Sequence, residues 1–159
     1  VLQWQQAAGI DWGIILLYGG GMALGSLAFQ TGLAEAIGKG ITAWLPSDTS
    51  GWVLIGAASV VAVFTSEFTS NTASANMVVP VAIALASASG GDPLSTAIAA
   101  TLAASLGFMM PVSTPCNAIV YGTGRVPLRS MMRAGIGLDI AGAIMVTLVV
   151  TLLSPLIFQ

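Results

Sequence analysis

Charged residues and histidine are what this chain lacks most. Only 6% of its 159 residues are charged, whereas soluble domains carry about 25%. The sequence is 56% hydrophobic, and this balance predicts an integral membrane protein in contact with the lipid bilayer. A formal net charge of −2 offers no basic surface, so we expect no nucleic-acid partner.

The absence of histidine narrows the possible chemistry. It removes Ser–His and Cys–His catalysis and leaves zinc and haem without a common ligand. Cys116 is the single cysteine, so no intrachain disulfide can form. An intramembrane enzyme with Ser70 or Ser113 as nucleophile would also lack a base, because Lys39 is far from both serines in sequence. We therefore expect no enzymatic activity, no catalytic residue and no cofactor.

Two polar islands interrupt the apolar sequence. The first is 66–72, Ser-Glu-Phe-Thr-Ser-Asn-Thr, and the second is 111–117, Pro-Val-Ser-Thr-Pro-Cys-Asn. In lipid every backbone N–H and C=O needs an internal partner, so irregular polar backbone persists only where it lines a protected cavity. Interrupted helices of this kind form the sites of secondary transporters. The islands predict a transport site, with a buried capped turn and a proline kink as the structural alternatives.

The chain before residue 50 predicts one span and one surface helix. Residues 12–29 are apolar and long enough to cross a bilayer, so we expect a scaffold transmembrane helix within 1–31. Residues 32–46 are shorter and amphipathic, and Glu35 and Lys39 stand four residues apart. That spacing supports one exposed helix face, which predicts an interfacial arm helix.

The first polar island divides 51–90 into two short apolar pieces. These pieces, 52–64 and 77–88, have 13 and 12 residues, which gives about 20 and 18 Å of helix against a hydrocarbon core of about 30 Å. Neither is expected to cross the membrane alone. We therefore predict a re-entrant helical hairpin over 51–90 with the island at its tip, which begins the half of a transport domain over 51–159.

A broken helix and a final span are predicted to follow. Pro111 and Pro115 lack backbone N–H groups, so a straight helix would lose two hydrogen bonds there. We expect one span over 94–124, broken at 113–117, and a last transmembrane helix over 134–158.

Arginine distribution predicts the orientation in the membrane. Arg125, Arg129 and Arg133 are three of four basic residues in the chain and are expected in the loop before the last helix. Because cytoplasmic loops are enriched in Lys and Arg, this loop is predicted to be cytoplasmic and the C-terminus to lie outside.

The hairpin tip is expected to bind both a cation and an anion. An ending helix leaves carbonyl groups unpaired and a starting helix leaves N–H groups unpaired. Carbonyl oxygens around Ser66, Thr69 and Asn71 suit a small hard cation, whereas the half-helix after Asn71 presents its positive end to an anion. Ser70 and Thr72 add hydroxyl groups at the same point.

These motifs carry a family resemblance. Residues 70–72, Ser-Asn-Thr, resemble the signature of the divalent anion/sodium symporter family, and 113–117, Ser-Thr-Pro-Cys-Asn, resemble its Thr-Pro-Pro-Asn loop. Residues 65–69 and 11–21 are similar to the C-terminal half of the same family, which belongs to the ion transporter superfamily. The resemblance implies one repeat of an inverted-repeat, elevator-type, homodimeric transporter, with the N-terminal repeat missing from a fragment or processed chain.

The resemblance also implies site residues at matching positions. Substrate would be bound by residues of both islands: Ser70, Asn71, Thr72, Thr114, Pro115 and Asn117. Sodium would be bound by backbone oxygens near Ser66, Thr69 and Ser113 and by the Asn71 side chain. Cys116 stands where the family usually has a second proline, a departure that bears on the rigidity of this loop.

The function predicted by these features is sodium-coupled symport of small divalent anions of the C4-dicarboxylate type. The alternatives within the superfamily are a dicarboxylate exchanger and a transporter of sulfate or another inorganic anion; a more remote one is a non-transporting membrane scaffold. We expect a multi-pass protein of a bacterial or archaeal inner membrane.

Two acidic residues are expected near these elements. Glu67 lies in the first island, where it could relay protons, neutralise the cation or act as a structural partner for a backbone donor or an arginine. Asp139 is expected to pair with Arg133 or to face an interface.

Overall fold

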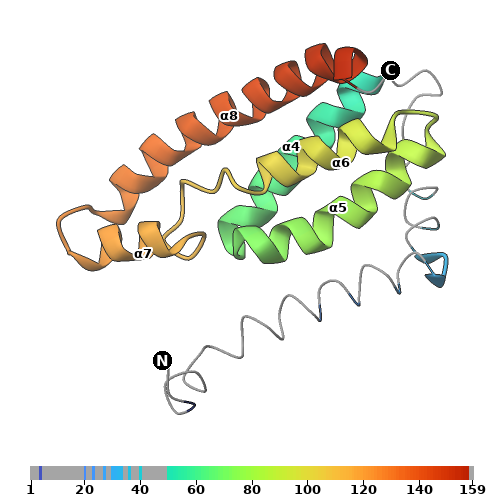
Figure 1. Cartoon of the computed structure of the whole chain (residues 1–159). Helices are drawn as coiled ribbons and strands as arrows, with labels where there is room; N and C mark the ends of the chain where they lie inside the picture. The colour runs from blue at the N-terminus through green and yellow to red at the C-terminus, as the bar shows by residue number, and fades with distance from the viewer. Residues whose placement is uncertain are drawn as a thin grey trace.

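The computed structural model describes residues 50–157 without a gap (Figure 1). Nearer the N-terminus it describes only scattered positions: Trp4, Gly20, Ala23, Leu27, residues 30–33, Ala36 and Gly40. The expected scaffold helix over 1–31 and arm helix over 32–46 therefore lie largely outside the described residues, as do Glu35 and Lys39.

Helices account for most of the stretch 50–157, and no strand occurs within it. The helices are α4 (Gly51–Phe68), α5 (Asn71–Ala88), α6 (Pro93–Ala103), α7 (Pro115–Gly122) and α8 (Leu128–Ile157). Three are long and apolar enough to cross a membrane: α4, α5 and Leu128–Leu156 of α8. The predicted class, an all-α membrane protein, is confirmed.

Helices α4 and α5 form a hairpin connected by Thr69 and Ser70 alone. Each helix has 18 residues, or about 27 Å of rise. The predicted lengths of 13 and 12 residues are wrong, because all of the first polar island except these two residues is helical. That the hairpin re-enters the membrane from one side stays a prediction.

Hydroxyl groups explain how polar residues extend these helices. Ser59 Oγ donates to the Ile55 carbonyl at 2.9 Å, and Thr65 Oγ1 donates to the Val61 carbonyl at 2.7 Å. Both bonds reach back four residues, so the hydroxyl group is satisfied without interrupting the backbone ladder. A hydroxyl-rich stretch at membrane depth is therefore compatible with a continuous helix.

The second interruption begins earlier than predicted. Helix α6 ends at Ala103, and residues 104–114 run without a regular helix until Pro115 starts α7. The predicted break at 113–117 is thus misplaced. Pro115 does not break a helix: at the first helical position its missing N–H removes no hydrogen bond and its fixed φ suits the helix.

The last helix also starts earlier than the predicted 134–158. It begins at Leu128, directly after Pro127. Arg129 and Arg133 consequently lie in the first two turns of α8 rather than in a loop. Both arginines are exposed.

Small residues let the helices of the hairpin and α6 pack closely. Alanine dominates the buried core that they share: Ala58, Ala62, Ala82, Ala100, Ala103 and Ala104. Close approach through small residues is the usual way that helices associate where lipid removes the hydrophobic drive for association.

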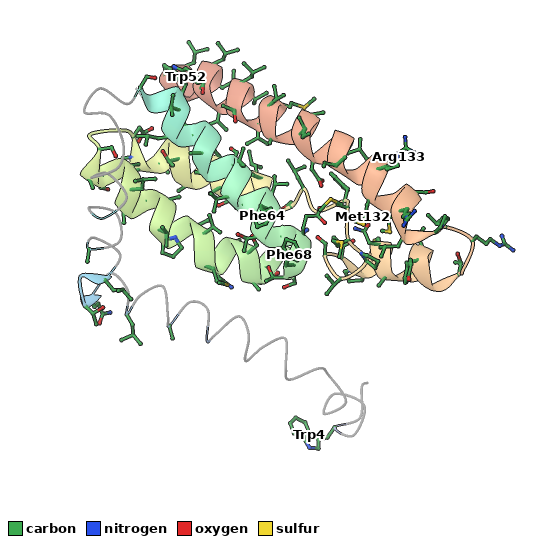
Figure 2. The ribbon with its side chains drawn as sticks, turned by 180° about the vertical axis from the view of Figure 1, so that it is seen from behind. Trp4, Trp52, Phe64, Phe68, Met132 and Arg133 are labelled. Atoms are coloured by element: carbon green, nitrogen blue, oxygen red, sulfur yellow. The ribbon has the colours of Figure 1, made fainter. Side chains whose placement is uncertain are left out.

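Helix α8 lies antiparallel to α4 and packs against α4 and α6. Gly56 on α4 faces Thr147 on α8, where an added Cβ would lie 3.5 Å from the threonine methyl group. Figure 2 shows Trp52 near the C-terminal part of α8 and Phe68 toward its N-terminal part. The outer face of α8 exposes large apolar side chains such as Leu152, as expected for a lipid-facing helix.

Asp92 holds the start of α6, which leads to the second interruption. Its carboxylate accepts from the N–H groups of Leu94 (3.0 Å) and Ser95 (3.2 Å) and from the Ser95 hydroxyl. These donors, the hydroxyl above all, lower the pKa of Asp92. The stabilisation is present above the ordinary pKa of Asp92 and is lost as pH falls through the lowered value.

Replacing Asp92 by alanine is expected to lower the stability of the protein by about 1 kcal/mol at neutral pH, because an N-cap is lost. Thermal unfolding in detergent at pH 7 measures the effect. Asp92→Asn keeps one acceptor oxygen and is the matched control, which should lose clearly less stability than Asp92→Ala, since asparagine also caps helices. Equal losses for both variants would contradict the capping role.

Candidate ion and anion site

Three oxygen atoms meet where the hairpin tip touches the end of α6. Ser66 Oγ lies 2.8 Å from Asn71 Oδ1 and 2.6 Å from the Ala104 carbonyl oxygen. Ser66 and Ala104 are fully buried. Since a hydroxyl group has one proton, Ser66 can donate to only one of these acceptors at a time. The other acceptor oxygen therefore faces Ser66 Oγ with no proton between the two atoms.

A fourth oxygen, Ser113 Oγ, lies beside this group. It is buried and has no hydrogen-bond partner among the residues that the structure describes. A Cβ atom added to Gly107 would overlap Ser113 Oγ and would lie 3.1 Å from Ser66 Oγ. Glycine at 107 is thus what allows both hydroxyl groups to approach the same stretch of backbone. We call Ser66 Oγ, Asn71 Oδ1, the Ala104 carbonyl oxygen and Ser113 Oγ the oxygen cluster.

The oxygen cluster has the chemistry of a site for a hard monovalent cation. It combines hydroxyl, amide and carbonyl oxygens from α4, α5, the end of α6 and the interruption after it. Carbonyl groups at the ends of half-helices are the ligands that transporters use for sodium. It brings together three of the predicted sodium residues, Ser66, Asn71 and Ser113, and adds Ala104. At Ser66 and Ser113 the oxygens that meet belong to the side chains and not to the backbone, as the prediction had it.

Thr69, the fourth predicted sodium residue, is oriented differently. Its hydroxyl donates to the Thr65 carbonyl at 2.9 Å, and its N–H bonds to the same oxygen at 3.1 Å. Its side chain therefore closes the end of α4, and the role of a backbone oxygen near Thr69 stays a prediction.

The predicted anion residues start two helices. Ser70 is the N-cap of α5 and accepts from the Ala73 N–H at 3.2 Å. Thr114 is the N-cap of α7 and accepts from the Asn117 N–H at 3.1 Å. The residues that follow the caps at these positive helix ends are Asn71 and Thr72 on α5 and Pro115 on α7. Both ends can therefore attract an anion.

Asn117 ties the start of α7 to the non-helical stretch before it. Its side-chain amide donates to the Gly107 carbonyl at 3.1 Å and to the Met110 carbonyl at 3.0 Å. Because Gly107 lies against Ser66 and Ser113, the start of α7 is held next to the hairpin tip (Figure 1). The amide group of Asn117 thus braces the interruption, a contact that the sequence does not predict.

Two acidic side chains bond the same interruption. Glu67 is 1% exposed, and its two oxygens accept from the N–H groups of Met109 (2.9 Å) and Met110 (2.6 Å). Asp139 on α8 accepts from the Phe108 N–H at 3.1 Å, and its carboxyl group contacts that of Glu67. We call this pair the carboxylate clamp.

The clamp bears on the predictions for both acidic residues. For Glu67, the expectation of a structural partner for a backbone donor is confirmed. For Asp139, the expected pairing with Arg133 is wrong, since its carboxylate is turned toward Phe108 and Glu67. Sequence reasoning could not find this contact, because Asp139 and Phe108 are 31 residues apart.

A cavity of about 620 Å³ lies between α4 and α8. Its walls are apolar apart from Glu67, Asp139 and Thr147. An apolar cavity with two carboxyl groups repels a dianion, so the helix ends and the oxygen cluster remain the better candidate site.

Comparison with known proteins gives the family. Residues 1–158 match the family model described as the sodium:sulfate symporter transmembrane region. The chain belongs to this family, which confirms the resemblance drawn from the two motifs.

The chain is similar to proteins called sodium-dependent dicarboxylate transporter SdcS. It is 34% identical to the one from Staphylococcus saprophyticus over 155 residues, which cover 98% of this chain. It is 32% identical to those of Staphylococcus aureus strains MRSA252 and USA300 over 157 residues, 99% of this chain. The chain spans about 30% of the length of each of these relatives.

Replacing Gly107 by alanine is expected to destabilise the protein by about 1–3 kcal/mol, because the new methyl group overlaps Ser113 Oγ. Thermal unfolding of the full-length protein in detergent would measure the loss. Gly122→Ala, at the end of α7, is the matched control, since nothing lies within 4 Å of its added Cβ. A Gly107→Ala variant as stable as that control would show that the backbone is not closely packed here.

Proposed function

We propose that this chain is part of a sodium-coupled symporter of small divalent anions of the C4-dicarboxylate type. The observation that carries the proposal is the convergence of Ser66 Oγ, Asn71 Oδ1 and the Ala104 carbonyl oxygen at two interrupted helices. The names of the staphylococcal relatives support the choice of substrate and of coupling ion.

Sodium would be held by the oxygen cluster. Its fit rests on two features: one Ser66 proton serves two acceptors, and buried Ser113 Oγ has no partner within the described part of the chain. A cation among these oxygens would satisfy the lone pairs that lack a proton. A backbone oxygen near Thr69 is proposed as a further ligand.

The anion would bind at the N-terminal ends of α5 and α7. Ser70, Asn71 and Thr72 on the first helix, with Thr114 and Pro115 on the second, would surround its carboxylates. Asn117, whose amide donors bond the Gly107 and Met110 carbonyls, would hold the start of α7 in place. Asn71 belongs to both sites, since its Oδ1 lies in the oxygen cluster and its backbone begins α5. A bound cation would therefore add positive charge beside the anion, which favours the two ligands binding together.

The full-length protein is proposed to be an elevator-type homodimer of a bacterial or archaeal inner membrane. Arg125, Arg129 and Arg133 are exposed near the start of α8, which supports a cytoplasmic position for that end and an outward C-terminus.

Transport of sulfate or another inorganic divalent anion is the second candidate, because the description of the family model names sulfate. Competition between succinate and sulfate for uptake separates the two substrates. An imposed sodium gradient that drives accumulation without counter-substrate separates symport from exchange.

Asn71→Ala and Thr114→Ala are each expected to reduce succinate uptake at least about tenfold, because each removes a group that would bond a charged ligand. Uptake by the full-length protein in proteoliposomes, driven by a sodium gradient, measures this. The matched control is Ser87→Ala near the other end of α5, whose hydroxyl only bonds its own helix. Wild-type transport by both site variants would refute the assignment of these residues.

Cys116 offers an independent test, because it is exposed at the second position of α7, beside Thr114 and Pro115. Sodium and succinate together are expected to slow its reaction with a maleimide, whereas succinate without sodium should not. Peptide mass spectrometry reports the modification of this residue alone. A cysteine placed at Ser87 serves as the control, and equal labelling of Cys116 under all conditions would place the anion elsewhere.

A further inference from the structure

The interruption after α6 exposes a row of backbone donors that other helices satisfy. Phe108, Met109 and Met110 lie in the non-helical stretch, so their N–H groups have no helical partner. All three donate to the carboxylate clamp: the first to Asp139, the other two to Glu67. Two acidic side chains from α4 and α8 therefore fix three consecutive peptide groups.

Glycines on α8 let this helix lie close to the interruption, so that the Asp139 carboxylate reaches its backbone. A Cβ atom added to Gly135 would overlap Met109 Cα and would lie 2.6 Å from the Phe108 carbonyl oxygen. At Gly142 it would lie 2.8 Å from a Leu106 methyl group. Positions 135, 139 and 142 are four and three residues apart, so they share one helix face. The face that carries Asp139 thus lies directly on the backbone of the interruption.

The same stretch of backbone carries half of the oxygen cluster. Ala104 lies at its beginning and Ser113 near its end, while Ser66 precedes Glu67 on α4. The distance of the Ala104 and Ser113 oxygens from Ser66 therefore depends on how 104–114 is held between α4 and α8.

The clamp does not itself supply ligands to the oxygen cluster. Both Glu67 oxygens are occupied by N–H groups, and Asp139 lies on α8, which contributes no oxygen to the cluster. Together the two side chains supply acceptor oxygens to all three N–H groups, so α4 and α8 both hold this backbone in place.

We propose that Glu67 and Asp139 are positioning residues for cation binding, which act by holding 108–110 so that the Ala104 and Ser113 oxygens face Ser66 and Asn71. This inference rests on the proposed function. It makes the affinity for the cation depend on α8, a helix that contributes no atom to the oxygen cluster.

The test is the sodium concentration that gives half-maximal succinate uptake by the full-length protein in proteoliposomes. Asp139→Leu removes the acceptor of the Phe108 N–H and is expected to raise this concentration roughly tenfold, or about 1.4 kcal/mol. Asp139→Asn keeps an acceptor oxygen and is expected to restore most of the affinity, to within about threefold of the parent protein. The KM for succinate at saturating sodium should change far less.

Gly135→Ala provides a second route that leaves both carboxylates in place. Its methyl group would displace the backbone at Phe108 and Met109, so we expect at least about a fivefold rise in the half-maximal sodium concentration. Gly137→Ala is the matched control two residues along α8, where an added Cβ meets nothing within 4 Å. It should behave as the parent protein.

The outcomes separate the inference from the function on which it rests. If the parent protein takes up succinate without any dependence on sodium, the proposed function fails. If uptake by the parent protein depends on sodium but Asp139→Leu and Gly135→Ala keep its sodium dependence, the positioning role is wrong. A purely structural role would lower the melting temperature equally in sodium and in potassium; a positioning role also reduces the extra stabilisation that sodium gives.

Discussion

Every polar backbone group that a broken helix releases inside a membrane must find a partner within the protein. This constraint shapes the second interruption. Its N–H groups at 108–110 are taken up by the carboxylate clamp, and its carbonyls at Gly107 and Met110 by the Asn117 amide. The oxygen atoms around Ser66 remain, and they outnumber the hydroxyl protons that could bond them.

The N–H groups and the carbonyl groups of the interruption therefore point toward different neighbours. Its N–H groups donate to the acidic groups of α4 and α8, whereas its Ala104 carbonyl oxygen belongs to the oxygen cluster at the tip of the hairpin. The positive ends of α5 and α7 lie beside that cluster, since Asn71 starts one helix and Asn117 ties the other to Gly107. In the proposed function a cation and an anion would therefore bind next to each other and share only Asn71 as a ligand.

Composition and two short motifs were enough to predict the membrane class, the family and the two interruptions. The helix ends could not be predicted, because hydroxyl groups such as that of Thr65 bond back to their own helix and polar residues therefore do not mark its end. Two parts of the site were also hidden. Ala104 contributes a backbone carbonyl, which leaves no trace in residue type, and Asp139 reaches Phe108 through a tertiary contact that local spacing cannot reveal.

A structure of the full-length protein determined in sodium with succinate, and again in potassium, would show whether the oxygen cluster holds the cation. We expect density for an ion within the oxygen cluster in sodium alone, in contact with Ser66, Asn71, Ala104 and Ser113. Sodium density outside this cluster would contradict the proposed site. So would a cluster that is the same in both salts although the protein carries out sodium-driven transport.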